Sequence, residues 1–413
     1  MLNRKLDQVF QYPLFQALAH RRVRRFGLGY EFTKDTFRFK SDKPPVPLDE
    51  LETALLAWAG HGISGLALGE GQIATGVHST WNGRVHPSPC NDQHTLLIIV
   101  NDDGVFAYQP PDATQLVEIA SPMDREKILT TYQEGIHQIS DKRPDFTETA
   151  WISANHWMAS RPGSTLIFPL VDLSAEHINH VLAAFEREKL RVIDERTGKP
   201  PGIGKWIDNG MLDGPGVTMS FMDHNTLTAQ IAAGFFIAQN IGLACEAMGL
   251  GYVTTRGVTP VVLGGTPFTE GLGCRFVSAK NGELNPVGLD GFLESHCPPY
   301  FENMDEAVDD FLAIRYGDNG ILLPDYAGPT PLREWQSVVS RASAMSQDAI
   351  QATKDFCNYV YDTYGRFPAL FDTIQLPIVV TVHHLDLDFY REFYPPEALS
   401  ETISEHMSNW HGD

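Results

Sequence analysis

The sequence predicts an α+β protein whose main sheet is largely antiparallel and flanked by helices. The apolar runs at residues 95–101 and 104–108 are joined by the turn-forming letters Asn-Asp-Asp-Gly, which is typical of a β-hairpin. Two further apolar runs, at residues 164–171 and 376–382, have the length of buried strands. Stretches with apolar residues at helical spacing lie between these strands, so helices are expected to cover the sheet.

The sequence marks two helices most clearly. One begins near residue 49, where Pro47 and acidic residues precede an apolar stripe, and it ends at Gly60. The other, about residues 225–249, is apolar on nearly all sides and is therefore expected at the centre of the protein, with a strand starting at Tyr252. The remaining helices are expected over residues 5–26 with a break at Pro13, 124–141, 175–188, 332–364 and 396–410.

Composition excludes several classes of partner. Acidic residues outnumber basic ones by 52 to 31, and the resulting formal charge of −21 argues against nucleic acid or an anionic membrane as a partner. No uncharged apolar stretch of about 18 residues predicts a transmembrane helix, and the first residues lack the apolar core of a secretory signal. Five scattered cysteines without a Cys-x-x-Cys motif indicate reduced thiols, so a cytoplasmic protein is expected.

A basic cluster near the N-terminus is the first candidate for binding chemistry. Arg21, Arg22, Arg24 and Arg25 follow His20 in a chain that is otherwise strongly acidic. Clustered guanidinium groups suit a phosphate, since each charge-assisted hydrogen bond contributes about 1.5–3 kcal/mol. The alternative is a solvated basic face at the C-terminal end of a helix, where the helix dipole favours positive charge.

Two further segments carry polar or glycine-rich patterns. Residues 87–93 place Ser, Asn and Gln side chains just ahead of a predicted strand, which suits the polar edge of a planar heterocycle. An ordinary turn before a strand would use the same residue types. Residues 239–257 run from Gln-Asn through Gly-Leu-Gly into a strand without forming a Gly-x-Gly-x-x-Gly motif. A buried helix with a glycine cap is the simpler interpretation of that segment.

Taken in order, these three segments resemble the motifs of the FMN-dependent nitroreductase superfamily. Residues 20–26 are similar to its His-Arg-Ser-Ile/Val-Arg-x-Phe motif, with Arg22 in place of serine. Residues 87–93 are similar to the start of its Pro-Ser-x-x-Asn-x-Gln-Pro-Trp loop, with His94-Thr95 in place of Pro-Trp. Residues 239–251 match its Gln-Asn to Gly-Leu-Gly helix. The resemblance covers roughly residues 15–275.

The resemblance implies a nitroreductase-like fold and an FMN-dependent oxidoreductase that transfers hydride at flavin N5 to or from a small organic substrate. It implies NAD(P)H as a possible reductant and a homodimer with FMN at its interface. The backbone amide of Arg256 or Gly257 is then expected to face N5. The cofactor-binding residues implied are His20, Arg21, Arg22, Arg24, Pro87, Ser88, Asn91, Gln93, Thr254, Thr255, Arg256 and Gly257.

One branch of the superfamily, the dehydrogenases that oxidise azolines in ribosomal peptides, is closest in layout. Residues 104–110, Gly-Val-Phe-Ala-Tyr-Gln-Pro, are similar to the Gly-Val-Tyr-x-Tyr-Asp-Pro of that branch. The Lys-Tyr pair that the branch often uses is absent, and Lys205-Trp206 is the nearest equivalent. An azoline-type dehydrogenase is therefore kept as an alternative, as is an enzymatically silent flavin-binding partner in a biosynthetic complex.

The same comparison suggests how the chain is divided. Residues 1–330 are expected to form the FMN-binding domain, with a lid or insertion at about 190–220. Residues 331–413 are expected to form a C-terminal helical extension that wraps the core or the partner subunit.

Three residues are expected near the substrate. They are Trp206 in the lid, His224 and Tyr252, and no catalytic residue is predicted.

No metal site is predicted. His383 and His384, with Asp386 and Asp388 nearby, have ligand chemistry, but adjacent residues of a strand point to opposite faces and do not readily bind one ion together. His406 and His411 are expected in an exposed, frayed terminal helix.

Overall fold

The computed structural model describes most of the chain. The described residues are 2–33, 36–66, 82–89, 94–110, 119, 121–146, 157–158, 160–256, 262–264, 271–318, 320–330, 332–341 and 344–412.

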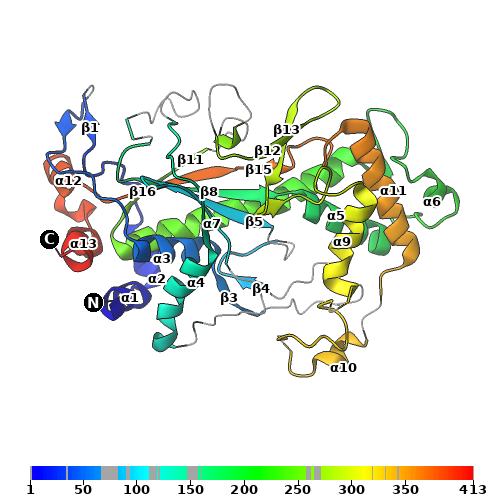
Figure 1. The fold of residues 1–413 in the computed structure, drawn as a ribbon, viewed down its shortest axis with the longest axis horizontal. Helices are drawn as coiled ribbons and strands as arrows, with labels where there is room; N and C mark the ends of the chain where they lie inside the picture. The colour runs from blue at the N-terminus through cyan, green and yellow to red at the C-terminus, as the bar shows by residue number, and fades with distance from the viewer. Residues whose placement is uncertain are drawn as a thin grey trace.

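An antiparallel sheet of seven strands forms the centre of the protein, in the order β11-β16-β8-β5-β6-β7 with β15 beside β8 (Figure 1). Every pairing in it is antiparallel, which confirms the predicted α+β class. The strands are β5 (Thr95–Asn101), β6 (Gly104–Tyr108), β7 (Ile136–Ser140), β8 (Thr165–Asp172), β11 (Gly251–Arg256), β15 (Ile374–Gln375) and β16 (Ile378–His383).

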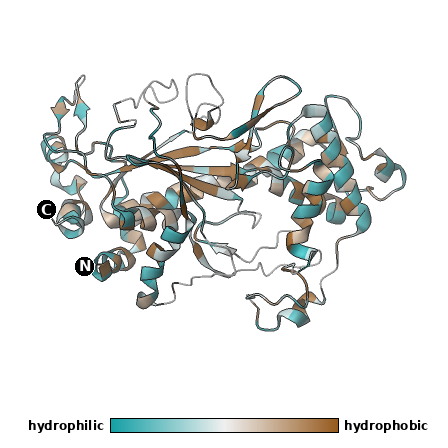
Figure 2. Ribbon diagram, viewed as in Figure 1, coloured by the Kyte–Doolittle hydropathy of each residue, from teal (hydrophilic) through white to brown (hydrophobic). Residues whose placement is uncertain are grey.

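The continuous apolar runs of β5 and β8 reflect burial on both faces of this sheet. All eight residues of β8 are buried, and strands covered on both sides need not alternate apolar with polar residues. The hairpin between β5 and β6 forms as predicted, with Asn101 opposite Gly104. Figure 2 shows the apolar residues concentrated in this sheet and in the helices beside it.

One face of the sheet packs on α3 (Glu50–His61), α4 (Lys127–Gly135) and α7 (Met219–Met248). Helix α3 begins with a capping box in which Asp49 and Glu52 each accept a hydrogen bond from the other's backbone. Gly249 ends α7 in the left-handed conformation, as its position in the sequence predicts. The other face packs on a smaller sheet of β12 (Arg275–Ser278), β13 (Leu284–Leu289) and β14 (Leu293–Glu294).

Helix α7 has the length and composition to cross a membrane. However, 56% of its most apolar window is buried inside the protein, which is typical of a core helix. Among the described residues it is the one helix with these properties.

The N-terminal helices are α1 (Leu2–Gln11) and α2 (Leu14–His20), separated at Pro13 as expected. The expectation of a helix to residue 26 is wrong, because α2 ends at His20. The arginines therefore follow the helix in extended chain rather than forming its last turn.

A second group of helices lies at the far end of the molecule from α2 (Figure 1). It comprises α5 (Ser174–Ala183), α6 (Gly204–Asp208), α9 (Met304–Tyr316), α10 (Trp335–Val339) and α11 (Gln347–Tyr364). The single helix expected over 332–364 is wrong: α11 starts afresh after Ser346, whose hydroxyl caps it. The helix expected over 124–141 likewise ends at Gly135, where β7 begins.

The C-terminal segment is part of the core. Strand β16 lies between β11 and β8, so residues beyond 330 complete the central sheet instead of only wrapping it. Helices α12 (Leu387–Phe393) and α13 (Glu401–Trp410) follow, and α13 lies beside α1, where Arg4 donates to Asn409 at 3.2 Å.

Three two-stranded sheets complete the described structure. They are β1 (Glu31–Phe32) with β2 (Phe39–Lys40), β3 (Ile63–Leu66) with β4 (Asn82–Arg84), and β9 (Arg191–Ile193) with β10 (Gly216–Thr218).

Candidate functional site

Arg21 joins the N-terminal arginine segment to the edge of the central sheet. Its exposed guanidinium donates a hydrogen bond of 2.5 Å to the hydroxyl of Tyr252 on β11. Burial raises the pKa of Tyr252, and the bond from Arg21 only partly opposes this, so the phenol keeps its proton at neutral pH. Two residues predicted for different roles, one for phosphate and one for substrate, are therefore direct neighbours.

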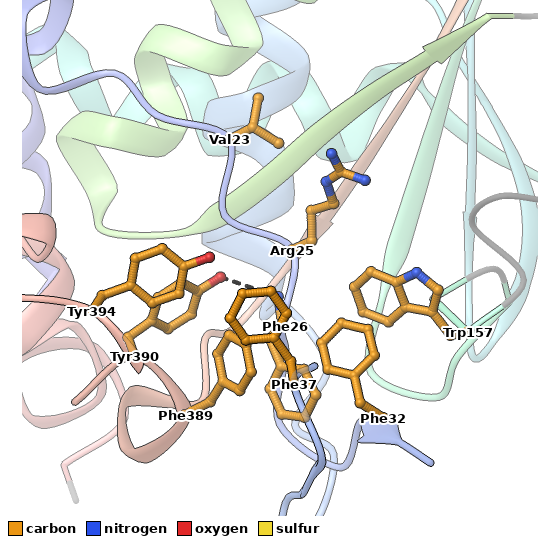
Figure 3. A pocket seen from close by; sticks show the side chains of 9 residues that line it. All are labelled: Val23, Arg25, Phe26, Phe32, Phe37, Trp157, Phe389, Tyr390 and Tyr394. Atoms are coloured by element: carbon orange, nitrogen blue, oxygen red, sulfur yellow. Dashed lines mark hydrogen bonds between the residues drawn. The ribbon is translucent and has the colours of Figure 1, made fainter. Parts of the chain in front are cut away.

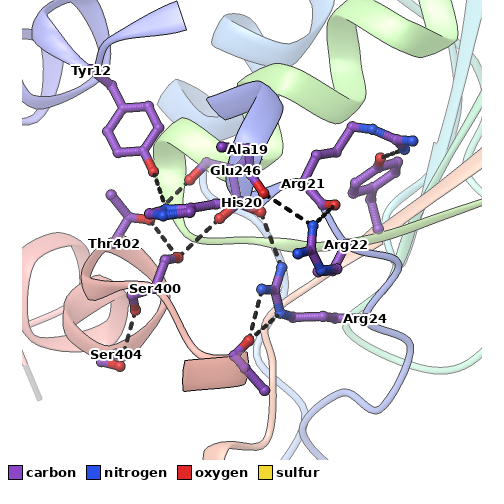
Figure 4. Close-up of polar contacts among 12 residues, drawn as sticks. Tyr12, Ala19, His20, Arg21, Arg22, Arg24, Glu246, Ser400, Thr402 and Ser404 are labelled. Atoms are coloured by element: carbon purple, nitrogen blue, oxygen red, sulfur yellow. Dashed lines mark hydrogen bonds and ion pairs between the residues drawn. The ribbon is translucent and has the colours of Figure 1, made fainter. Parts of the chain in front are cut away.

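Arg24 has a different environment from the other arginines (Figure 4). Its side chain is buried, and Nη1 lies 3.0 Å from Oε2 of Glu246 near the end of α7. Its Nε and Nη2 both donate to the carbonyl of Ala398, at 3.1 and 2.7 Å. Glu246 also accepts a hydrogen bond from Ser400. The expected contact of Arg24 with a phosphate does not fit this arrangement, because the guanidinium is directed into the protein.

His20, Arg22 and Arg25 lie on the surface beside Arg21. The Nδ1 of His20 lies 3.3 Å from the hydroxyl of Tyr12. Arg22 uses Nη1 to donate to the carbonyls of Ala19 and Arg21, at 3.1 and 2.9 Å. The exposed cations of the segment are thus Arg21, Arg22 and Arg25.

An aromatic cavity of about 360 Å³ opens beside this segment (Figure 3). Its walls include a stacked pair, Phe26 and Phe389, whose ring centroids are 4.2 Å apart, and the hydroxyl of Tyr390 accepts from the Phe26 backbone. The volume is at the small end of the range for ligand sites. The lining residues are Val23, Arg25, Phe26, Phe32, Phe37, Trp157, Phe389, Tyr390 and Tyr394.

Sequence reasoning missed this cavity. The usable signal is that aromatic residues recur at 26, 32, 37 and 39 and again at 389, 390, 393 and 394.

A second, apolar cavity of about 320 Å³ lies between the N-terminal helices, α3 and α7. Its wall includes Asn240, whose Nδ2 donates to the carbonyl of Val85 at 3.1 Å. This bond brings the chain just before Pro87 and Ser88 against the helix that carries the Gln-Asn pattern. Pro87 is exposed and Ser88 is half-buried. Asn91, Gln93 and Gly257 lie outside the described residues.

Strand β11 lies at one edge of the central sheet as far as the structure describes it. An edge strand leaves alternate backbone N–H groups without a strand partner. Thr254 and Arg256 are exposed and Thr255 is half-buried. Residues 254–256, the described part of the segment expected to face a flavin, are therefore accessible, and they start two residues after Tyr252.

Trp206 and His224 do not lie near Tyr252 and the open edge of β11, contrary to expectation. Trp206 donates to Asp355 of α11 at 2.7 Å, at the opposite end of the molecule from α2 (Figure 1). His224 lies near the start of α7 with its Nδ1 2.7 Å from the carbonyl of Ser220. At 1.5 Å per residue, about 36 Å of helix separates it from Met248.

Comparison with known proteins adds little to this picture. No protein-family model matches the sequence, and no curated protein matches it significantly. A crystal structure of a provisionally named nitroreductase from Ralstonia eutropha JMP134 is 14% identical and covers 59% of this chain and 69% of its own, with a TM-score of 0.25. We base no inference on a likeness with so low a TM-score.

Proposed function

We propose that the protein is an FMN-dependent oxidoreductase with its flavin beside the Arg21–Tyr252 contact. The main support is that two side-chain hydrogen bonds connect the three segments whose order resembles the motifs of the nitroreductase superfamily. Arg21 bonds to Tyr252, which joins the first segment to the third. Asn240 bonds to Val85, which joins the third segment to the chain leading into the second.

Arg21 and Arg22 suit the phosphate, because both are exposed and adjacent. Arg24 is left out, since its donors are used by Glu246 and Ala398. Ser88, with Asn91 and Gln93, would contact the polar edge of the ring. The open edge of β11 offers backbone N–H groups for flavin N5 near Arg256, and the contact expected of Gly257 stays a prediction. Bound flavin supplies the hydride chemistry, and the protein positions and tunes it.

A homodimer is part of the proposal. Helix α2 and the chain after it expose Leu14, Phe15 and Val23, and Phe15 is 82% exposed. Helix α7 exposes Phe235 and Phe236 on its surface. Large exposed apolar side chains on neighbouring helices support an interface between two copies.

The test is direct binding of FMN, followed by reduction. We expect purified protein to bind FMN, and Arg21→Ala to weaken binding roughly 10- to 100-fold through loss of one charge-assisted bond. Arg341→Ala, an exposed arginine on the distant α10 side, is the matched control and should bind normally. Protein that binds no FMN, or an Arg21→Ala variant that binds as wild type, would overturn the proposal.

Kinetics then separate the remaining possibilities. Consumption of NAD(P)H with a nitro, quinone or enone acceptor identifies a reductase. Oxygen uptake with a substrate identifies an oxidase or an azoline-type dehydrogenase. Bound flavin that neither NAD(P)H nor substrate reduces identifies a silent flavin-binding partner.

A further inference from the structure

Four potential metal ligands from distant parts of the chain meet at one point. Glu52 comes from α3, His384 directly follows β16, His406 lies on α13 and His411 directly follows it. The Nε2 atoms of the three histidines lie 3.0, 2.9 and 3.1 Å from the same oxygen, Oε1 of Glu52. One ligand atom from each residue lies within 4.8 Å of all the others.

The cluster is buried, which corrects the expectation that the terminal histidines are exposed. Glu52, His384 and His406 are 0%, 1% and 2% exposed, and only His411 reaches the surface. Among the described residues, no lysine or arginine forms an ion pair with Glu52. A buried carboxylate without a cation is costly, because the protein interior solvates charge poorly.

Backbone contacts fix how two of the rings face the centre. The Nδ1 of His384 lies 2.8 Å from the carbonyl of Val46, and the Nδ1 of His406 lies 2.7 Å from the carbonyl of Met248. A ring nitrogen bonds to a carbonyl only when it carries a proton, so each neutral ring presents a bare Nε2 to the centre. Such outer hydrogen bonds commonly orient metal-binding histidines.

His384 and His411 lie at hydrogen-bonding distance from Oε1 of Glu52, at 3.0 and 3.1 Å, and each bonds there only if its Nε2 carries a proton. Two bare nitrogen lone pairs beside an ionised carboxylate oxygen repel one another unless a proton or a cation lies among them. The Nε2 of His406 is buried and has no hydrogen-bond partner, although it lies 2.9 Å from Oε1. The other oxygen of Glu52 is already used, since Oε2 accepts from the Asp49 backbone in the cap of α3 at 2.6 Å. Glu52 is thereby held with Oε1 facing the three rings.

We propose that Glu52, His384, His406 and His411 bind a divalent transition-metal ion, with zinc as the best fit. Three imidazoles and one carboxylate are ligands that zinc accepts in a four-coordinate tetrahedral site. Ligand atoms of such a site stand about 3.3 Å apart, close to the separations seen around Oε1. Calcium and magnesium prefer oxygen ligands and fit this set poorly.

The site is structural in character. All four positions come from protein, whereas a catalytic zinc keeps one position for water or substrate. The ion would fasten α13 to α3 and to the end of β16. The chain leading into α13 holds Ser400 and Ala398, which contact Glu246 and Arg24. A bound ion would therefore also stabilise the segment behind the proposed flavin site.

A second group of ligands, His94, Asp172 and His296, does not support the same conclusion. The oxygens of Asp172 already accept hydrogen bonds from Ser174 and Ser295. The Nε2 of His296 pairs instead with Asp310 at 3.3 Å. The carboxylate of Asp172 therefore has its hydrogen-bond partners without an ion.

The experiment measures metal content and metal-dependent stability in the full-length chain. We expect about one zinc ion per purified chain by elemental analysis. After removal of metal with a chelator, added zinc should raise Tm by several degrees, because the ion binds only the folded state. Cobalt added to the metal-free protein should give the intense visible bands of tetrahedral coordination.

Variants distinguish this site from surface binding. His411→Ala removes the most exposed ligand and should lose the zinc-dependent rise in Tm. His137→Ala, an exposed histidine on β7, is the matched control and should keep it. The proposal is overturned if wild type shows neither a zinc-dependent Tm nor tetrahedral cobalt bands, or if His411→Ala responds to zinc as wild type does. The cobalt spectrum decides the matter on wild type even if a variant fails to fold.

Discussion

Arg24 gives the sharpest test of which arginines bind phosphate and which stabilise the fold, because Arg24 is buried whereas the neighbouring arginines are exposed. The Arg24→Met variant keeps the aliphatic stem but removes the ion pair with Glu246 and both bonds to Ala398. Glu246, only 1% exposed, would keep a hydrogen bond from Ser400 but no cation. Removing one partner of a buried pair costs about 3–5 kcal/mol of unfolding free energy.

The assay combines urea and thermal unfolding with FMN titration. We expect Arg24→Met to lower Tm by roughly 3–6 °C while the remaining folded protein binds FMN nearly as wild type does. The double variant Arg24→Met/Glu246→Leu should recover much of the loss, since two apolar side chains can replace a buried pair at little cost. Arg21→Ala should show the opposite pattern, with weakened FMN binding and little change in stability.

One result would refute this reasoning. If Arg24→Met unfolded like wild type but bound FMN at least tenfold more weakly, Arg24 would be a phosphate ligand, as its place in the sequence pattern suggested. The contact with Glu246 would then contribute little to stability.

Three further predictions test other parts of the structure. A Cβ at Gly242 would lie 2.7 Å from the buried Tyr252 ring. Gly242→Ala should therefore displace that ring from Arg21, weaken FMN binding in a titration, and lower the unfolding free energy by about 1–3 kcal/mol in calorimetry. A chain ending at residue 330 lacks β16 and should be insoluble or unfolded by circular dichroism; a soluble flavin-loaded dimer would contradict this. Burial raises the pKa of Asp223 to about 7, so the folded state holds this proton more tightly than the unfolded chain. The resulting stability is complete below about pH 4 and is lost as pH rises through 7, by at most about 4 kcal/mol. In urea unfolding, the free energy of unfolding of Asp223→Asn should therefore rise relative to that of wild type as pH is raised from 5 to 8. If the difference between the two proteins is the same at both pH values, Asp223 ionises normally.

Local sequence patterns were sufficient for the main secondary structure. The runs at 95–101 and 164–171 predicted β5 and β8, because burial on both faces demands uninterrupted apolar residues. The break at Pro13 and the end of α7 at Gly249 follow from backbone chemistry that one residue sets. The helix expected at 332–364 failed because a new cap at Ser346 interrupts an amphipathic pattern that otherwise continues.

The sites depend on contacts between distant residues, which local patterns do not contain. Four arginines within five residues look equivalent, and only burial against Glu246 distinguishes Arg24 from Arg21. Sequence reasoning considered His384 only with its neighbour His383 on one strand, whereas the groups that meet His384 come from α3, from α13 and from the residue after α13. Asn91, Gln93 and Gly257 stay predictions.

The position of β16 also governs when the protein is able to assemble. In the described structure, β11 joins the sheet through β16, and residues 378–383 of β16 pair with strands that lie about 120 to 220 positions earlier in the chain. During synthesis, β8 and β11 therefore emerge from the ribosome long before the strand that lies between them. Until then their edges are open to mispairing and aggregation. We expect folding to finish only after residue 383 is released, and the edge of β11 proposed to meet FMN to form at that last step.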